Sequence, residues 1–215
     1  SVELGSGMQL AMWENNQDRV NVCSNHHTLS MYIHGGYQSY QKTPQGWHNG
    51  GGPDRMCLMP QDYESTWDLR DPLTFVHLYY TEQHLKRVAE QVWDKEPSQI
   101  ILNPQIFVAD PQISMIYRHF LLNAEWENRE NHLQMSTATT LLLNHLIKNY
   151  SHAHWQAPVV KGGLSPYVLK QVLQWIDQPK FQTFLQMFSP LYSLQDWCFV
   201  LTWLCYLECN NHKAS

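Results

Sequence analysis

Histidine is the residue type in this sequence with the widest chemical reach, because a neutral imidazole binds metal ions and a titrating one transfers protons. The chain has twelve histidines. His26 and His27 are adjacent, and neighbouring side chains of a strand point to opposite faces, so they cannot both line one interior. His34 and His77 could join His27 at a metal, but Ser30 to Gly36 contains no Glu to complete a ligand set. We therefore expect no metal site and no cofactor.

The other residue patterns that support catalysis are also missing from the sequence. There is no G-x-S-x-G, no P-loop and no G-x-G-x-x-G ahead of a helix. We interpret the run from Gly50 to Pro53 as a hairpin loop rather than a phosphate cradle. The five cysteines are odd in number and form no C-x-x-C pair, which favours reduced thiols. The sequence therefore predicts a protein that is not an enzyme and has no catalytic residues.

Charge and hydropathy limit the partners of this chain. The formal net charge is -5 and only 15% of the residues are charged, so no global basic field attracts nucleic acid. No signal peptide is visible at the N-terminus. The apolar stretch from Trp197 to Leu207 is too short for a span of ~20 residues. We expect a cytoplasmic protein without a membrane partner.

Residues 1 to about 80 have the pattern of short strands. Leu29, Met31 and Ile33 alternate with other residues before the run breaks at Gly35-Gly36. A turn-rich stretch with several Gly and Pro follows, and then come DRMCLMPQD, STWDL and LTFVHLYY. Short strands punctuated in this way are typical of a β-sandwich or a barrel.

The pattern becomes helical at Thr81, a candidate cap. The apolar residues that follow are spaced to form one helix face: Leu85, Val88, Ala89, Val92 and Trp93. A second helix is predicted from Asp110-Pro111 to about Glu125, with Asp110 as cap and Pro111 in the first position. A third is predicted from Asn131 to Tyr150. The short polar turn between the last two predicts an antiparallel helical hairpin.

A further helical unit begins after a candidate linker that ends at Gly162-Gly163. Ser165 can cap this helix while Pro166 takes its first position, where a missing N–H has no cost. The apolar side chains of the predicted helix fall on one face: Leu169, Val172, Leu173 and Ile176.

The order of these segments resembles the AraC/XylS-type bacterial transcription regulators. The residues G-G-L-S-P-x-x-L-x-x-V-L-x-x-I-D, from Gly162 to Asp177, resemble the opening of the family's DNA-binding domain. The N-terminal part is similar to the family's cupin-like sensor at His27 to Ser30, at Gly52-Pro53 through Pro60, and at Phe75 to Leu85. The resemblance extends from residue 25 to about residue 179.

The resemblance implies an α+β protein with an N-terminal cupin-like β-barrel or jelly roll, a helical hairpin and a partial helix-turn-helix unit. The implied boundaries are 1–105 for the effector-sensing domain, 106–152 for the linker and dimerisation helices, 153–163 for a linker, and 164–215 for an incomplete DNA-binding domain. The implied function is ligand-responsive transcription regulation by a homodimer. The implied partners are a small-molecule effector and, for an intact family member, DNA.

The sequence departs from the family after residue 179. A recognition helix needs Lys and Arg to neutralise phosphates, yet Lys213 is the single basic residue from Phe181 to Ser215. The stretch is also shorter than the family's domain. A reading-frame shift near residue 180 would explain this tail, and a divergent C-terminus that packs as a hydrophobic helix is the alternative. We predict that this chain does not bind DNA specifically.

Candidate functional residues follow from the implied fold. Residues that could line the sensor interior, or could equally form a packed core, are Met31, Ile33, Trp47, Met56, Leu58, Trp67, Phe75 and His77. Residues of the hairpin that could form a dimer interface, or could cover the sheet instead, are Ile113, Ile116, Phe120, Leu142 and Leu146. The scaffold helix of the DNA-binding unit would comprise Ser165, Leu169, Val172, Leu173 and Ile176.

Two other functions are compatible with the sequence. One is a stand-alone cupin-like sensor that dimerises with an intact regulator and blocks it. The other is a cupin-type metalloenzyme, which would carry a stoichiometric metal.

Overall fold

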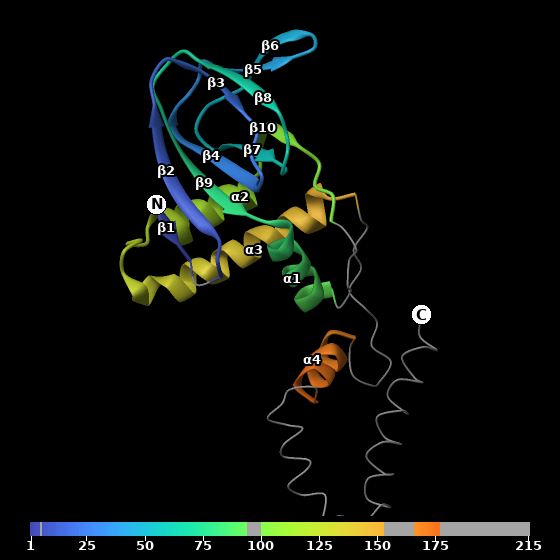
Figure 1. Ribbon diagram of the computed structural model, residues 1–215. Coiled ribbons are helices and arrows are strands. Elements are labelled where there is room, and N and C mark those ends of the chain that lie inside the picture. The colour runs from blue at the N-terminus through green and yellow to red at the C-terminus, as the bar shows by residue number, and fades with distance from the viewer. Residues whose placement is uncertain (5, 94–99, 153–165, 177–215) are drawn as a thin grey trace, which may run out of the picture. The chain divides into compact units, whose positions relative to one another are not determined.

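A computed structural model describes residues 1–4, 6–93, 100–152 and 166–176 (Figure 1). The chain divides into two compact units, Ser1–Val88 with Pro97–Trp155 and Ala89–Glu96 with Gln156–Ser215. The first unit contains all the described strands and the predicted helical hairpin. The predicted boundaries at residues 153, 163 and 164 lie outside the described residues.

Two antiparallel sheets form the body of the first unit. The larger has the strand order β1-β2-β9-β4-β7-β10 and the smaller has the order β3-β8-β5-β6. The strands of the larger sheet are β1 (Val2–Glu3), β2 (Gln9–Asn15), β9 (Leu73–Tyr80), β4 (His27–Gly35), β7 (Arg55–Met59) and β10 (Gln105–Ala109). Those of the smaller are β3 (Asp18–Val22), β8 (Ser65–Leu69), β5 (Ser39–Thr43) and β6 (Gly46–Asn49).

The sequence predicted a β-rich N-terminal fold, and the structure has one. The structure is not the closed barrel that was one form of this prediction. Within the described strands, no strand of one sheet pairs with a strand of the other. The structure is therefore an open sandwich of two sheets. β10 was not predicted at all, because its apolar run lies between two segments with helical patterns.

One face of the larger sheet is a continuous apolar layer. Leu10, Leu78, Leu29 and Leu58 lie opposite one another on four neighbouring strands, and each is fully buried. The adjacent row joins Val76, Met31 and Met56, which are buried as completely. The helices α2 and α3 cover this face (Figure 1). Burial of about 1.5–3 kcal/mol per such side chain makes this layer the main source of stability in the unit.

The helices begin where their caps predict. α1 (Glu82–Trp93) follows Thr81, whose backbone N–H donates to the imidazole Nδ1 of His84 at 3.0 Å. This contact replaces the Glu of a capping box with a histidine at the same position. α2 (Pro111–Ile116) begins at its Asp110 cap, as predicted, and continues as the π-helical segment η1 (Tyr117–Leu122). The predicted end at Glu125 was therefore three residues too late.

The second half of the hairpin also matches its prediction. A short 3-10 turn, η2 (Arg129–Asn131), leads into α3 (His132–Tyr150). The hairpin is fixed to the sheet by the Tyr117 hydroxyl, which donates to the Leu29 carbonyl at 2.8 Å. Arg118 adds an ion pair with Asp54 at 2.6 Å.

The hairpin residues predicted for a dimer interface lie largely inside the protomer. Ile113, Ile116, Leu142 and Leu146 are buried, whereas Phe120 is 41% exposed. The first four side chains cover the sheet, which is the alternative role considered for them, and cannot form an outer surface in this conformation. A dimer interface on the hairpin would have to use Phe120 and exposed neighbours such as Met115 and Leu141.

Asp110 joins the two ends of the helical layer. Its Oδ1 accepts the backbone N–H groups of Gln112 and Ile113 at the start of α2. Its Oδ2 accepts a bond from Tyr150 at 2.6 Å and lies 2.7 Å from His145 Nε2, both at the end of α3. Burial raises the pKa of Asp110, but these hydrogen bonds outweigh it and hold the pKa below its usual range. The carboxylate is therefore the form that the fold stabilises.

In the second unit, the structure describes α4 (Pro166–Ile176), which begins at Pro166 as predicted. Leu173 is exposed. Ser165 and the side chains of Leu169, Val172 and Ile176 lie outside the described residues. None of the described helices is long and apolar enough to cross a membrane.

We expect Tyr150→Phe to destabilise the protein by about 2 kcal/mol, because it removes a hydrogen bond to a charged carboxylate. Tyr37→Phe is the matched control, since Tyr37 is 65% exposed, and should change stability by less than ~0.5 kcal/mol. Urea unfolding of both variants measures the difference. Equal stability of the two would show that Asp110 does not need Tyr150.

Candidate functional site

A cavity of about 220 Å³ lies between the two sheets. Its walls come from six strands and the loops next to them. The lining residues are Asn15, Val20, Val22, Ser24, His26, Thr28, Ser30, Tyr32, Cys57, Met59, Trp67, Leu69, Leu73, Phe75, His77 and Tyr79.

The floor of the cavity is the second face of the larger sheet. On this face one row across the strands reads Ala11, His77, Ser30 and Cys57. Three of these four side chains are small, so they do not fill the space between the sheets. The neighbouring row through Phe75 and Tyr32 and the row through Tyr79, Thr28 and Met59 have bulkier members. The cavity is therefore a direct result of side-chain size along one row.

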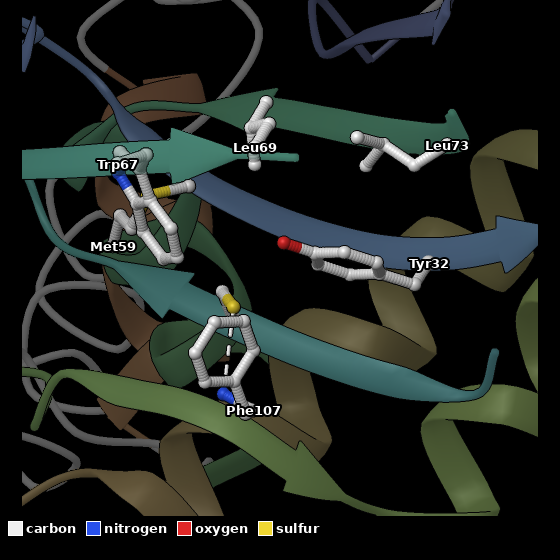
Figure 2. Close-up of a cluster of buried hydrophobic side chains, with 7 residues drawn as sticks. Tyr32, Met59, Trp67, Leu69, Leu73 and Phe107 are labelled. Atoms are coloured by element: carbon white, nitrogen blue, oxygen red, sulfur yellow. Dashed lines mark hydrogen bonds between the residues drawn. The ribbon is translucent and has the colours of Figure 1, made fainter. Parts of the chain in front are cut away.

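The smaller sheet supplies the opposite wall. Val20 and Trp67 lie opposite one another on β3 and β8, with Val22 and Leu69 further along the same strands. Figure 2 shows Trp67 and Leu69 facing Tyr32 and Met59 across the space. The Trp67 indole N–H donates to Ser65 Oγ at 2.9 Å, so the buried ring keeps no unpaired donor.

Phe107, on β10, packs against three residues that line the cavity, Trp67, Tyr32 and Cys57. Its ring lies edge-on to Trp67 at a centroid distance of 5.6 Å and against Tyr32 at 6.1 Å. Its backbone N–H donates to Cys57 Sγ at 3.5 Å, the dashed line in Figure 2. Phe107 has φ 57°, which is unusual for a bulky residue, and it lies at a bulge in the β10–β7 pairing. The bulge and the positive φ in β10 place the Phe107 ring against Trp67 and Tyr32.

Among the described residues that line the cavity, none is Lys, Arg, Asp or Glu. Burial raises the pKa of the Cys57 thiol to about 12. Burial also raises the pKa of the Tyr32 hydroxyl well above its ordinary value. Both groups are therefore neutral at physiological pH.

Two polar lining residues, His77 and Tyr79, are joined by a hydrogen bond. The Trp13 indole N–H donates to the Tyr79 hydroxyl at 2.9 Å, and this hydroxyl lies 2.9 Å from Nδ1 of His77. Burial lowers the pKa of His77 to about 3, with a further lowering from His26. His77 is thus a neutral imidazole at the edge of an apolar space.

The structure places the predicted interior residues on both sides of the larger sheet. Trp67, Phe75 and His77 line the cavity. Met31, Met56 and Leu58 lie on the opposite face against the helices, and Ile33 is buried away from the cavity. Trp47 is on the outer surface of β6, where its ring lies 5.2 Å from the guanidinium of Arg19. Contact of any of these residues with a ligand stays a prediction.

Sequence reasoning missed the lining residues Ser30, Tyr32, Cys57 and Tyr79. The prediction took the more apolar half of β4 as the interior of a barrel. In the structure this half faces the helical layer, and the other half, which includes Ser30 and Tyr32, faces the cavity. The alternation along β4 separates the residues of its two faces correctly. The sequence of one strand does not show which face the helices cover.

The histidines considered for a metal are separated in the structure. His26 lines the cavity, while Nδ1 of the buried His27 accepts the Gln61 backbone N–H at 3.0 Å. His34 is exposed. Within the described residues, no group of three or more His, Cys, Asp or Glu is arranged to hold a metal ion.

We expect acid to destabilise this protein partly through His77. The folded pKa of about 3 lies below the ordinary histidine pKa of 6.5, so between these values the unfolded chain binds the proton and the folded chain does not. The free energy of unfolding should therefore fall as the pH drops from about 6.5 toward 3, and His77→Phe should make this fall shallower. Chemical denaturation from pH 7 to pH 4 measures both slopes. Parallel slopes would contradict a buried neutral His77.

Comparisons with known proteins give structural neighbours at low similarity. No protein-family model and no curated protein matches the sequence. The AraC-like transcriptional activator CuxR is 10% identical with a TM-score of 0.43, covering 93% of this chain and 76% of CuxR. Vibrio cholerae ToxT is 8% identical with a TM-score of 0.47, covering 93% of this chain and 72% of ToxT. Clostridium difficile EutQ is 12% identical with a TM-score of 0.30, covering 34% of this chain and 56% of EutQ, little more than half of that protein.

Proposed function

We propose that this chain binds a small, uncharged and largely apolar molecule between its two sheets, without catalysis, as the sensing part of a transcription regulator of the AraC type. The observation that supports binding is the cavity itself, a largely apolar space with some polar groups in its lining. Sites for small molecules in proteins have this composition.

The size of the cavity limits the ligand. At about 220 Å³ it is smaller than the ~300 Å³ at which pockets for drug-sized molecules begin. A single aromatic ring with a short substituent has suitable dimensions, and the aromatic side chains of Phe75, Tyr32 and Trp67 can stack against such a ring.

The charge of the cavity limits the ligand further. A buried carboxylate or ammonium without a partner costs several kcal/mol. The described lining residues supply no opposite charge, and His77 is neutral. Neutral ligands are therefore favoured over ionised molecules of the same shape.

The regulatory part of the proposal rests on the sequence. The segment order, the Gly162–Asp177 resemblance and the start of α4 at Pro166 support it. Residues 177–215, on which DNA binding depends, lie outside the described residues. The proposal accordingly assigns ligand binding to this chain and specific DNA binding to an intact regulator of the type.

We expect small neutral aromatics to raise the thermal unfolding temperature of the chain and to quench its tryptophan fluorescence through Trp67. Ser30→Phe should abolish both effects, because the new ring fills the space above the small row. Ser114→Phe is the control, since Ser114 lies on α2 outside the cavity. If Ser30→Phe folds and binds as the wild type does, the cavity is not the binding site.

We expect no sequence-specific DNA binding by this chain, because Lys213 is the single basic residue from Phe181 to Ser215. Fluorescence anisotropy with a pool of random duplexes, repeated at several salt concentrations, measures this. A selected duplex that binds tightly, with an affinity that falls steeply as salt rises, would overturn the expectation.

A further inference from the structure

A hydrogen-bonded chain with a defined direction ends at the cavity-lining residue His77. The indole N–H of Trp13 can only donate, so the Tyr79 oxygen accepts it at 2.9 Å. The Tyr79 O–H is then free to donate to Nδ1 of His77, which lies at 2.9 Å. In the reverse direction the Tyr79 oxygen would accept from both Trp13 and His77, and its own hydrogen would have to turn to solvent. The direction from Trp13 to Tyr79 to His77 is the one that pairs every hydrogen of the chain within the protein.

This direction fixes the tautomer of His77. An imidazole whose Nδ1 accepts a hydrogen bond carries its proton on Nε2 when it is neutral. Within the described part of the chain, no group is within hydrogen-bond distance of Nε2, although Nδ1 is bonded to Tyr79. His77 also lines the cavity, between Phe75 and Tyr79. Its N–H thus has no protein partner among the described residues, and a molecule in the cavity can accept from it.

The surroundings of His77 make this donor selective. Across the strands its neighbours are Ala11 and Ser30, which leave room beside the ring. The Phe75 ring packs on one side at a centroid distance of 4.8 Å, and the Tyr79 ring stands edge-on at 5.4 Å. The imidazole is therefore held in place by aromatic contacts, and a ligand has to adapt to its direction.

We infer that the ligand carries a hydrogen-bond acceptor, such as a carbonyl oxygen, that binds the Nε2–H of His77, and that Trp13 and Tyr79 act as positioning residues for this donor. This inference rests on the proposed binding function and specifies its ligand class as a small neutral molecule with one acceptor on an apolar body. The acceptor meets His77, and the apolar body lies toward Trp67 and Leu69. A pure hydrocarbon leaves the donor unpaired, and a carboxylate brings an uncompensated charge.

The test uses three probes of the same shape and number of heavy atoms. Acetophenone has a neutral carbonyl, α-methylstyrene has a methylene in place of that oxygen, and benzoate carries a charge. We expect the full chain to bind acetophenone about fivefold to tenfold more tightly than α-methylstyrene, the gain from one hydrogen bond to an otherwise unpaired donor. Benzoate should bind most weakly at neutral pH. Titration calorimetry measures the three dissociation constants.

Two variants separate the inference from the proposed function. His77→Phe should keep the affinity for α-methylstyrene and lose the preference for acetophenone, whereas Tyr37→Phe, on the exposed loop, should keep the preference. Equal binding of the two neutral probes by the wild type would overturn this inference and leave the binding function intact. Failure of both neutral probes to bind would overturn the binding function and the inference with it.

The tautomer itself provides a test that does not need a ligand. Long-range ¹H–¹⁵N spectra of the free protein should show a protonated Nε2 and an unprotonated Nδ1 for His77 at pH 7, and Tyr79→Phe should weaken this bias. This readout stays valid if His77→Phe does not fold. A protonated Nδ1 in the wild type would contradict the proposed direction of the chain.

Discussion

The alternation of side chains along the central strands β4 and β9 is the constraint on which the rest of this structure depends. Because neighbouring residues point to opposite faces, Leu29 and Leu78 face the helices while Ser30 and His77 face the smaller sheet. Side chains pack the first face without leaving space for solvent. The second face leaves a cavity, because most side chains in the row Ala11, His77, Ser30 and Cys57 are small. One pair of strands thereby provides both the stable core and the cavity. A shift of register by one residue would exchange the two faces and destroy both.

The polar groups of the unit follow the same division. On the helical side Asp110 joins the start of α2 to the end of α3, whereas the buried Tyr80 hydroxyl and Asn144 Oδ1 have no partner among the described residues. On the cavity side the chain from Trp13 to His77 satisfies every group up to the last nitrogen. The last nitrogen borders the cavity, so a ligand or a water molecule there can accept its hydrogen bond.

The sequence was informative wherever a local signal decided the structure. Asp110-Pro111 predicted the start of α2, and the spacing around Leu85 predicted α1, because capping and helix periodicity depend on residues close in the chain. The sequence was uninformative where a distant segment decided. The apolar run of β10 is a strand because it pairs with β7, and Met31 faces helices that lie about eighty residues further along the chain. The same limit explains why, of the predicted interior residues, Trp67, Phe75 and His77 line the cavity and Met56 and Leu58 face the helices. The choice between the two faces depends on tertiary packing.

Phe107 shows how the cavity and the helical layer are joined. Its ring packs against residues that line the space between the sheets, and its backbone adopts a strained conformation to bring it there. Gly50 accommodates the ring closely, since a Cβ at that position would lie 2.8 Å from it. Asp110, the cap of α2 and the partner of Tyr150, is only three residues further along the chain. Val108 and Ala109 are therefore the whole covalent connection between a ring that packs on the cavity-lining residues Trp67 and Tyr32 and the residue that holds the helical hairpin together. A residue as bulky as phenylalanine is tolerated at a positive φ only when its surroundings compensate for the strain. At Phe107 the compensation comes from ring contacts with Trp67 and Tyr32. These two residues also line the space that a ligand would enter.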